Sequence, residues 1–306
     1  MVEFQQGIWR FHPLTKKFEL FSEGGGNTYG LDFDRHGQLI AGTNWGGYAM
    51  LHQFPGAYYI KGFAKHGPLH NPFTFGYFDH VPYKNFKGGH VTCGGILYDA
   101  DLYPEALRHQ YLACNLLSNA IYWHKLEAVG ASFRAEHGGE LLETDDPWFR
   151  PLDLCLGPDG CVYVADWYDR RAAHLDPIDN WHKDSGRIYR IEYQGGPRYP
   201  QVDLTRQSVA ELAALLRHPN KWYRATARQL LAERRDPAAY AALRQMLEQE
   251  RDWPALEALW GLYASGGWSD AVLQLGLAHA HEQVRAWTIR LAADMPERWP
   301  AGRLSP

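Results

Sequence analysis

GLDFDRHGQLIAGTN at residues 30–44 and DLCLGPDGCVYVADW at residues 153–167 are two versions of one pattern. Each contains a short strand, a tight polar turn that closes on Gly37 or Gly160, and a second strand with alternating apolar side chains. The two turn glycines are separated by about three repeats of roughly 41 residues, which is the length of one propeller blade. The spacing therefore predicts a β-propeller segment made of antiparallel blades.

Similar strands recur elsewhere in the first 193 residues, which are rich in glycine and aromatic side chains. GIWRFHP at residue 7, NAIYWHKL at residue 119 and GRIYRIEY at residue 186 each alternate like a single β-strand. Since a blade needs roughly 40 residues, this part holds four to five blades at most. The chain also begins within a strand-like segment, so we expect Met1 not to be the natural start, earlier blades to be missing and the ring to stay open.

The composition changes near GGPRYPQVDL, residues 195–204, from glycine-rich strand patterns to a helical sequence rich in Ala, Leu and Arg. SVAELAALLRH (208–218) and KWYRATARQLLAER (221–234) have helical periodicity and predict a helical hairpin. Arg224 aligns with Arg285 in a later repeat, which indicates three helix pairs in a HEAT-like array. We therefore predict a mainly β plus α fold, with a partial β-propeller at 1–195 and HEAT-like repeats at 204–300. The leucines expected in one continuous helical core are Leu212, Leu215, Leu230, Leu256, Leu259 and Leu291.

Charge and apolar patterning exclude several classes of function. The formal net charge of −4 provides no basic footprint for nucleic acid. No apolar run approaches the roughly 18 residues of a membrane span, and the N-terminus has no signal-peptide pattern. The four cysteines form neither C-x-x-C nor the haem-attachment motif C-x-x-C-H, so we expect buried free thiols.

Residues 145–171, DDPWFRPLDLCLGPDGCVYVADWYDRR, hold the richest candidate site. Asp166 and Asp169 follow an expected strand, where loop ends of propellers gather functional side chains. Arg150 could clamp an anion, whereas each Asp could instead cap a turn through backbone N–H groups. His90 lies between paired glycines that permit close approach of a ligand, and its intrinsic pKa suits a general base. The candidate site residues are catalytic His90, Arg150 and Asp166, and substrate-binding Asp153, Trp167, Tyr168 and Asp169.

We predict no dedicated metal site. Asp176, Asp179 and Asp184 offer oxygen ligands within one loop, but their spacing matches no EF-hand and favours a solvated acidic loop. His66, His70 and His80 lack tight metal-ligand spacing. Cys93 could act as a nucleophile only beside an activating base, so a buried thiol is favoured.

Taken together, GIWRFHP, EGGGNTYGLDFDRHGQLIAGTNWGGYAML, YYIKGFAKHGPLHNPFTFGYFDHVPYKNFKGGHVTCGGILY, NLLSNAIYWH, DDPWFRPLDLCLGPDGCVYVADWYD and SGRIYRI resemble the PVC-type haem-binding family, also described as membrane-bound dehydrogenases. The resemblance runs from residue 7 to about residue 193. It implies a propeller like that of quinoprotein sugar dehydrogenases, HEAT-like repeats and an extracytoplasmic location. Quinone or calcium is possible by this resemblance, as is a cytochrome c domain or partner protein, although this chain carries no haem motif.

Two functions stay open at the level of the sequence. The first is a dehydrogenase-like oxidoreductase that oxidises a sugar-like substrate and passes electrons to a quinone or partner haem. In it His90 takes the substrate proton, Arg150 holds the anionic cofactor, and Asp166 or Asp169 orients groups. The second is a non-catalytic scaffold that binds carbohydrate or protein. We expect the chain by itself to be inactive as a dehydrogenase.

Overall fold

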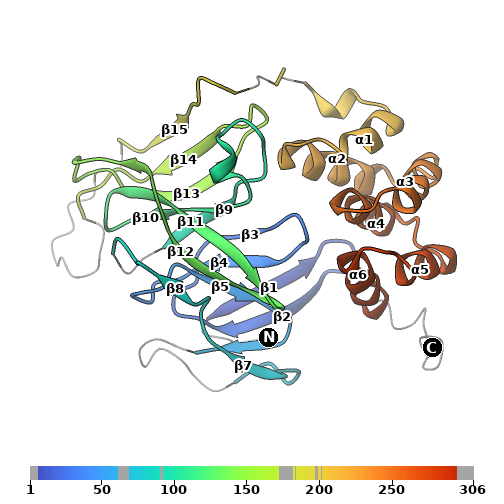
Figure 1. The fold of residues 1–306 in the computed structure, drawn as a ribbon, viewed down its shortest axis with the longest axis horizontal. Coiled ribbons are helices and arrows are strands. Elements are labelled where there is room, and N and C mark those ends of the chain that lie inside the picture. The colour runs from blue at the N-terminus through green and yellow to red at the C-terminus, as the bar shows by residue number, and fades with distance from the viewer. Residues whose placement is uncertain are drawn as a thin grey trace. The chain divides into compact units, whose positions relative to one another are not determined.

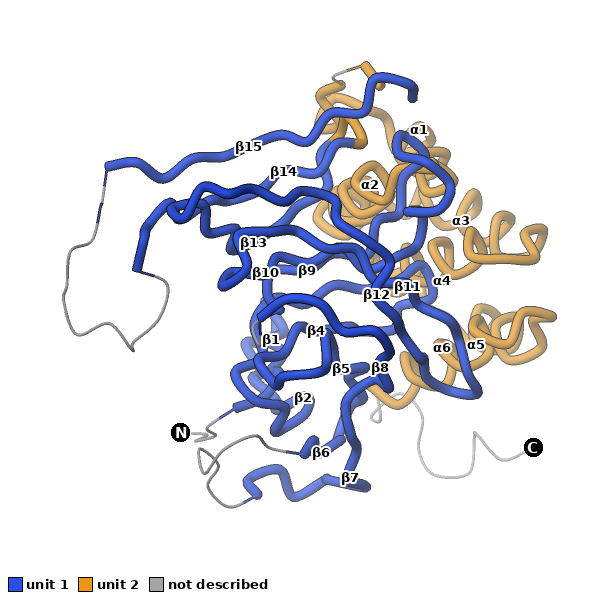
Figure 2. Tube along the Cα trace, turned by 60° about the vertical axis from the view of Figure 1, so that its left-hand side comes forward, with its two compact units in different colours: residues 1–157, 161–197 blue, residues 158–160, 198–306 orange. Residues whose placement is uncertain are grey.

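The computed structural model describes residues 6–60, 69–89, 92–171, 182, 184–196, 199–200 and 202–294. The chain divides into two compact units, shown in different colours in Figure 2. Unit 1 contains residues 1–157 and 161–197, and unit 2 contains residues 158–160 and 198–306. The described residues combine several β-sheets with six α-helices, and the sheets do not close into a barrel.

The described strands of unit 1 form four sheets, and Figure 1 shows how they follow one another along the chain. The strands, in the order in which they pair, are β1 (Gly7–His12), β2 (Lys17–Gly24), β6 (Ala57–Tyr59) and β7 (Gly76–Phe78) in one sheet; β3 (Leu31–Phe33), β4 (Leu39–Gly42) and β5 (Met50–Gln53) in the second; β8 (Tyr83–Lys84), β12 (Ser132–Glu143), β11 (Ala120–Val129), β10 (Tyr111–Asn115) and β9 (Cys93–Leu97) in the third; and β13 (Pro151–Leu156), β14 (Val162–Asp166) and β15 (Arg187–Ile191) in the fourth.

Both hairpins expected from the repeated pattern are confirmed. Strands β3 and β4 pair antiparallel with Asp32 opposite Ile40, and β13 and β14 pair antiparallel with Leu154 opposite Val164. Gly37 and Gly160 adopt φ angles of 73° and 79° in the connecting turns. Glycine suits these positions because it has no Cβ to clash in the left-handed region.

The sheet that contains β1 departs from the expected antiparallel blades. Strands β1 and β2 are antiparallel, but β6 pairs parallel with β2, and β7 pairs parallel with β6. The chain leaves β2, forms the whole β3–β5 sheet and then returns to pair with β2. A long connection of this kind permits parallel pairing, which a tight hairpin cannot produce.

The inner strands β3, β9 and β13 approach one another through glycine. A Cβ on Gly94, at φ 53°, would lie 2.2 Å from the carbonyl oxygen of Leu152 and 2.4 Å from the Cα of Asp153. A Cβ on Gly30 would in turn lie 2.6 Å from the Cα of Gly94. The glycine-rich segment around residue 94 therefore permits close approach of protein backbone between sheets.

Apolar side chains fill the space between these sheets. One cluster, which includes Tyr98, Leu112, Ile121 and Val164, lies between the third and fourth sheets. All four cysteines are free thiols, and Cys93, Cys114 and Cys161 are buried as expected, but Cys155 is exposed. The reason is that Cys155 lies on the strand face opposite to the buried Leu154, since side chains alternate along β13.

Unit 2 consists of helices that pack in sequence-adjacent pairs. Their bounds are α1 (Val209–Leu215), α2 (Lys221–Arg234), α3 (Ala238–Gln249), α4 (Trp253–Ser265), α5 (Asp270–Leu277) and α6 (Glu282–Ala293), with a short 3-10 turn at Leu204–Arg206. Ser208 and Glu211 form a capping box at the start of α1, and Asn220 caps α2. These caps explain why both helices begin where the sequence predicted.

A single apolar cluster connects the helix pairs. Leu212, Leu256 and Leu259 are fully buried in it, Leu291 is almost so, and the partly buried Leu215 and Leu230 pack against it. The expected continuous core is therefore confirmed. None of the helices in the described part of the chain has the length and apolar composition needed to span a bilayer.

Arg224 and Arg285 occupy equivalent positions in two of the pairs. Nη1 of Arg224 donates to the carbonyl oxygens of His218 and Pro219, and Nη1 of Arg285 donates to those of His279 and Ala280. Each arginine therefore ties its helix to the turn before it. The sequence alignment of the two residues corresponds to one shared geometry.

We expect Gly94→Ala to destabilise the protein far more than Gly130→Ala. Both residues have left-handed backbones, with φ angles of 53° and 60°, so each substitution carries the same backbone penalty of about 1–2 kcal/mol. A Cβ on Gly130 meets nothing within 4 Å, whereas one on Gly94 collides with β13. Overpacking should add about 1–3 kcal/mol or more for Gly94→Ala in urea unfolding. Equal losses would show that the sheets do not depend on this contact.

Leu256→Ala should lower the free energy of unfolding by about 2–5 kcal/mol, because it opens a cavity in the core of unit 2. Leu230→Ala is the matched control, since it removes the same atoms from a partly buried position. Its loss should be smaller. Chemical denaturation of the two variants measures the difference, and a larger loss for Leu230→Ala would contradict this arrangement of the core.

Candidate functional site

Arg150, Asp166 and Asp169 come together at the end of the β13–β14 hairpin. Arg150 precedes β13, and Asp166 is the last residue of β14. The backbone N–H of Arg150 donates to Oδ1 of Asp166 at 2.8 Å, and the N–H of Tyr168 donates to the same oxygen at 2.8 Å. Asp166 thus joins the residue before β13 to the turn that follows β14.

The guanidinium of Arg150 is buried and engaged with backbone carbonyl oxygens. Nε donates to Asp169 at 3.0 Å, Nη1 to Leu116 at 3.3 Å and Nη2 to Arg170 at 3.0 Å. Burial lowers the pKa of Arg150 from its usual value, and the carboxylates of Asp169 and Asp166 oppose that shift. These bonds commit the guanidinium to the turn and leave it poorly placed to clamp an anion.

Asp169 is also buried, and its carboxylate accepts from backbone N–H groups. Oδ1 accepts from Arg171 at 3.0 Å, and Oδ2 accepts from His182 at 3.3 Å. Both oxygens of Asp169 therefore stabilise the segment after β14, which is the turn-capping alternative described above.

Asp166 differs from Asp169 in its second oxygen. The side chain is only 4% exposed, and among the described residues no donor reaches Oδ2. A buried carboxylate oxygen without a hydrogen bond is costly, and such groups are uncommon in folded proteins. Asp166 thus has one carboxylate oxygen, Oδ2, that accepts no hydrogen bond from the described residues.

Aromatic side chains surround the turn. The side chain of Trp167 is 41% exposed. Tyr168 has a left-handed backbone with φ 50°, and the guanidinium of Arg187 lies 4.2 Å from its ring centroid. The ring of Trp148 contacts those of Tyr168 and His182. Arg187 thus occupies one face of Tyr168, while Trp167 keeps exposed ring surface.

Asp153 lies apart from this turn. It pairs with Ala165 within the sheet, its Oδ1 accepts from the neighbouring N–H of Leu154, and its side chain is exposed. Partial desolvation raises its pKa. Its charge acts on Tyr29 and Cys93, which places it with the inner strands. The structure therefore separates Asp153 from the residues with which the sequence grouped it.

Several predicted residues lie outside the described residues. These are His90, His66, Asp176 and Asp179. The nearby Cys93 is described: burial raises the pKa of its thiol to about 12, which suppresses the thiolate at neutral pH.

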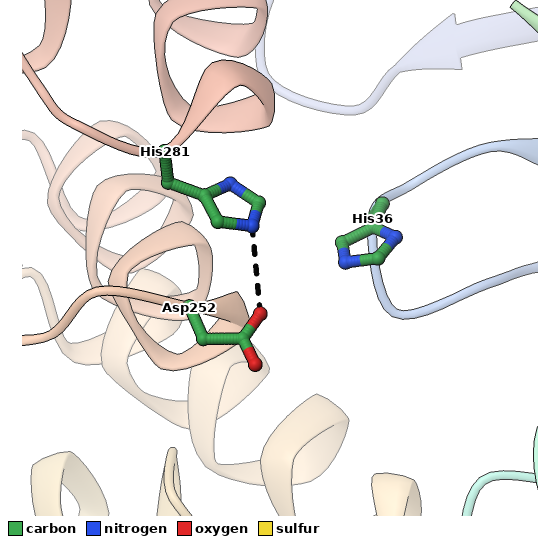
Figure 3. A group of neighbouring side chains, drawn as sticks. All are labelled: His36, Asp252 and His281. Atoms are coloured by element: carbon green, nitrogen blue, oxygen red, sulfur yellow. Dashed lines mark ion pairs between the residues drawn. The ribbon is translucent and has the colours of Figure 1, made fainter. Parts of the chain in front are cut away.

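Ligand-type side chains also meet in unit 2. Nε2 of His281 lies 3.4 Å from Oδ1 of Asp252 (Figure 3). His36, drawn in the same figure, belongs to unit 1. Two ligands from unit 2 fall short of the four that a structural zinc site uses.

Sequence reasoning overlooked a second polar cluster in unit 1. His52 and Ser132 line a cavity of about 220 Å³, and Nδ1 of His52 lies 3.0 Å from Oγ of Ser132. The available signal was a histidine within an apolar strand, MLHQ. That signal alone could not identify Ser132, because the two residues are 80 positions apart.

Residues 1–195 match the family model described as "Domain of unknown function (DUF7133)". No curated protein matches the chain.

Solved structures similar to this chain include sugar dehydrogenases. An oxidoreductase (glucose dehydrogenase) from Thermus thermophilus is 19% identical with a TM-score of 0.39, and the match covers 56% of this chain and 46% of that one. A glucose dehydrogenase is 19% identical with a TM-score of 0.36, and the match covers 59% of this chain and 49% of that one. The PQQ-bound aldose sugar dehydrogenase from Streptomyces coelicolor is 17% identical with a TM-score of 0.35, and the match covers 59% of this chain and 47% of that one. The chain thus spans about half the length of these structures, and TM-scores below 0.5 assign it no activity.

Asp166→Ala should lower the free energy of unfolding by about 1–3 kcal/mol, because two backbone N–H groups lose their buried acceptor. Asp145→Ala removes the same charge at an exposed position and should change stability by less than about 0.5 kcal/mol. Thermal unfolding of both variants tests the difference. Similar stabilities would mean that Asp166 does not hold the turn.

Proposed function

This chain belongs to the family defined by the domain of unknown function DUF7133, and we propose that it is a segment of a dehydrogenase that oxidises a sugar-like substrate. In this proposal residues 1–195 form β-propeller blades and residues 204–300 form HEAT-like repeats. The resemblance to the PVC-type haem-binding family supports an extracytoplasmic location. It also supports electron transfer to a quinone or to the haem of a cytochrome c partner.

The observation that carries the proposal is the unpaired Oδ2 of Asp166. Oδ1 already holds the turn, so the second oxygen, which is buried, stays available to a substrate hydroxyl that enters the interior of the turn. The ring of Trp167, the next residue, is exposed and adds an apolar surface to the same turn. A turn that carries both a carboxylate and an exposed aromatic ring suits a ligand with polar and apolar parts.

Oxidation of an alcohol removes a proton from oxygen and a hydride from carbon. The chain's own part would be to orient the hydroxyl through Asp166 and to take its proton. His90 stays our candidate for the base, since an imidazole titrates near neutral pH. Arg150 would act as a positioning residue that holds the Asp166 turn, rather than as an anion clamp.

The described residues of unit 1 provide no assembled set of ligands for the cofactors that the resemblance suggests. Three N–H groups of Arg150 already donate to backbone carbonyl oxygens, which leaves this guanidinium a weak partner for an anionic quinone. The acidic residues Asp176 and Asp179, which the sequence offered as oxygen ligands, lie outside the described residues. We therefore derive no step through quinone or calcium, and the electron acceptor rests on the resemblance alone.

A non-catalytic scaffold for carbohydrate or protein is the second candidate. Three aromatic residues at every second position, two before β7 and one within it, have highly exposed side chains. They are Phe73 (83% exposed), Phe75 (66%) and Tyr77 (74%). Exposed aromatic side chains in such a row often mark an interaction surface. Binding that depends on this row, without turnover, would favour the scaffold.

The dehydrogenase predicts sugar-dependent reduction of a redox dye when a quinone cofactor and a c-type cytochrome are supplied. Asp166→Asn preserves an oxygen for the turn but replaces the second acceptor with a donor, so turnover should fall at least about 10-fold while folding persists. His90→Ala should lower it roughly 10²- to 10⁴-fold. Asp145→Asn is the control and should match the wild type. If Phe75→Ala abolishes sugar binding and no variant reduces the dye, the dehydrogenase proposal is wrong and the scaffold is favoured.

A further inference from the structure

The cavity of about 220 Å³ in unit 1 combines an apolar wall with a hydroxyl, two imidazoles and a carboxylate. Phe54, Phe78, Val81, Val129 and Ala131 line its apolar part, and His52, Asp79, His80 and Ser132 line its polar part. His52 lies in β5, and Ser132 begins β12 directly after the turn of the β11–β12 hairpin. None of the residues of the Arg150 turn lines this cavity.

The hydrogen bonds of His52 determine which ring nitrogen carries the proton. Nε2 lies 3.1 Å from Oε1 of Gln38, and this carbonyl oxygen can only accept. Nε2 is therefore the protonated nitrogen of the neutral ring, which makes Nδ1 an acceptor. Oγ of Ser132 lies 3.0 Å from Nδ1 and donates to it. Hydroxyl, imidazole and carbonyl thus form one directed chain.

Packing holds the imidazole in that orientation. His52 is 3% exposed, and its ring lies 4.1 Å from that of Phe54 and 4.9 Å from that of Phe133 between centroids. Ser132, in contrast, is only partly buried and borders the cavity. A fixed base beside an accessible hydroxyl is the arrangement that nucleophilic catalysis requires.

A second chain of the same kind shows why accessibility matters. Oγ1 of Thr43 lies 2.9 Å from Nε2 of His80, and Nδ1 of His80 lies 3.4 Å from Oδ1 of Asp79. Burial lowers the pKa of His80, which keeps its ring neutral. Thr43 is fully buried and does not border the cavity, so no ligand can reach its hydroxyl. Of these two hydroxyls, Ser132 is the one a ligand can contact.

We propose that Ser132 is a nucleophile that accepts a short acyl group from an ester, with His52 as its general base and Gln38 as the residue that orients His52. Oγ of Ser132 attacks the ester carbonyl carbon while its proton passes to Nδ1 of His52. The bond to the leaving alkoxide then breaks, and the alkoxide takes that proton. Water hydrolyses the acyl-serine by the same route and releases a carboxylic acid.

The size of the cavity limits the acyl group. Drug-sized ligands occupy pockets of roughly 300–1,000 Å³, so about 220 Å³ suits a small acyl chain such as acetyl or butyryl. The aromatic and aliphatic wall would contact the chain, and the hydroxyl lies at the polar end. This activity is separate from the proposed sugar oxidation, since it uses neither Asp166 nor an electron acceptor.

The test uses the full chain, a fluorophosphonate probe and p-nitrophenyl acetate. Peptide mapping by mass spectrometry should locate one phosphonyl adduct on Ser132, formed as fluoride leaves and the hydroxyl proton passes to His52. Ser132→Ala should abolish the adduct, and His52→Gln should slow both labelling and ester hydrolysis roughly 10²- to 10⁴-fold. Ser118→Ala is the matched control, because Ser118 is also partly buried but accepts from a backbone N–H and contacts no imidazole in the described structure.

Circular dichroism of each variant establishes that it is folded, and Ser132→Ala removes only one oxygen at a partly exposed position. An adduct on Ser132 that depends on His52 supports the proposal. An unlabelled wild-type protein overturns it, as does labelling or hydrolysis that persists unchanged in folded Ser132→Ala. Equal rates for wild type and folded His52→Gln would remove His52 as the base.

Discussion

The close approach of three inner strands is the constraint on which unit 1 depends. Gly30 precedes β3, Gly94 lies in β9, and the backbone at Leu152 and Asp153 belongs to β13. A side chain at either glycine would occupy the place of neighbouring backbone atoms. Without a Cβ the sheets can converge at their inner strands, and the apolar clusters between them can then close.

The same convergence positions the Arg150 turn. Pro151 follows Arg150 into β13, and Asp166 ends β14 directly opposite, so the hairpin register brings the two residues together. The carboxylate of Asp166 then performs a structural task with one oxygen and leaves the other unpaired in the described structure. The structural task of Asp166 therefore depends on Oδ1, and the proposed substrate contact would depend on Oδ2.

Unit 2 reaches stability by a different route. Its helix pairs share one apolar core, and a buried charge network supplements it: Nε of Arg224 lies 3.2 Å from Oε1 of Glu257, and Arg228 also pairs with that carboxylate. Two arginines around one glutamate, with Arg224 also bonded to carbonyl oxygens, satisfy the hydrogen-bonding needs of these buried charges. Such pairing links α2 to α4 through charged side chains as well as through the apolar core.

Local pattern alone determined the hairpins around Gly37 and Gly160, the helix at 221–234, the leucine core and the equivalence of Arg224 and Arg285. Each depends on periodicity, caps or turns within a short stretch of chain, which the sequence displays directly. Tertiary structure alone decided that β6 and β7 pair in parallel, that the Arg150 donors reach carbonyl oxygens, and that Asp153 lies with the inner strands. It also brought His52 to Ser132 across 80 residues. Contacts of this kind depend on how sheets pack against one another, and no local periodicity records that packing.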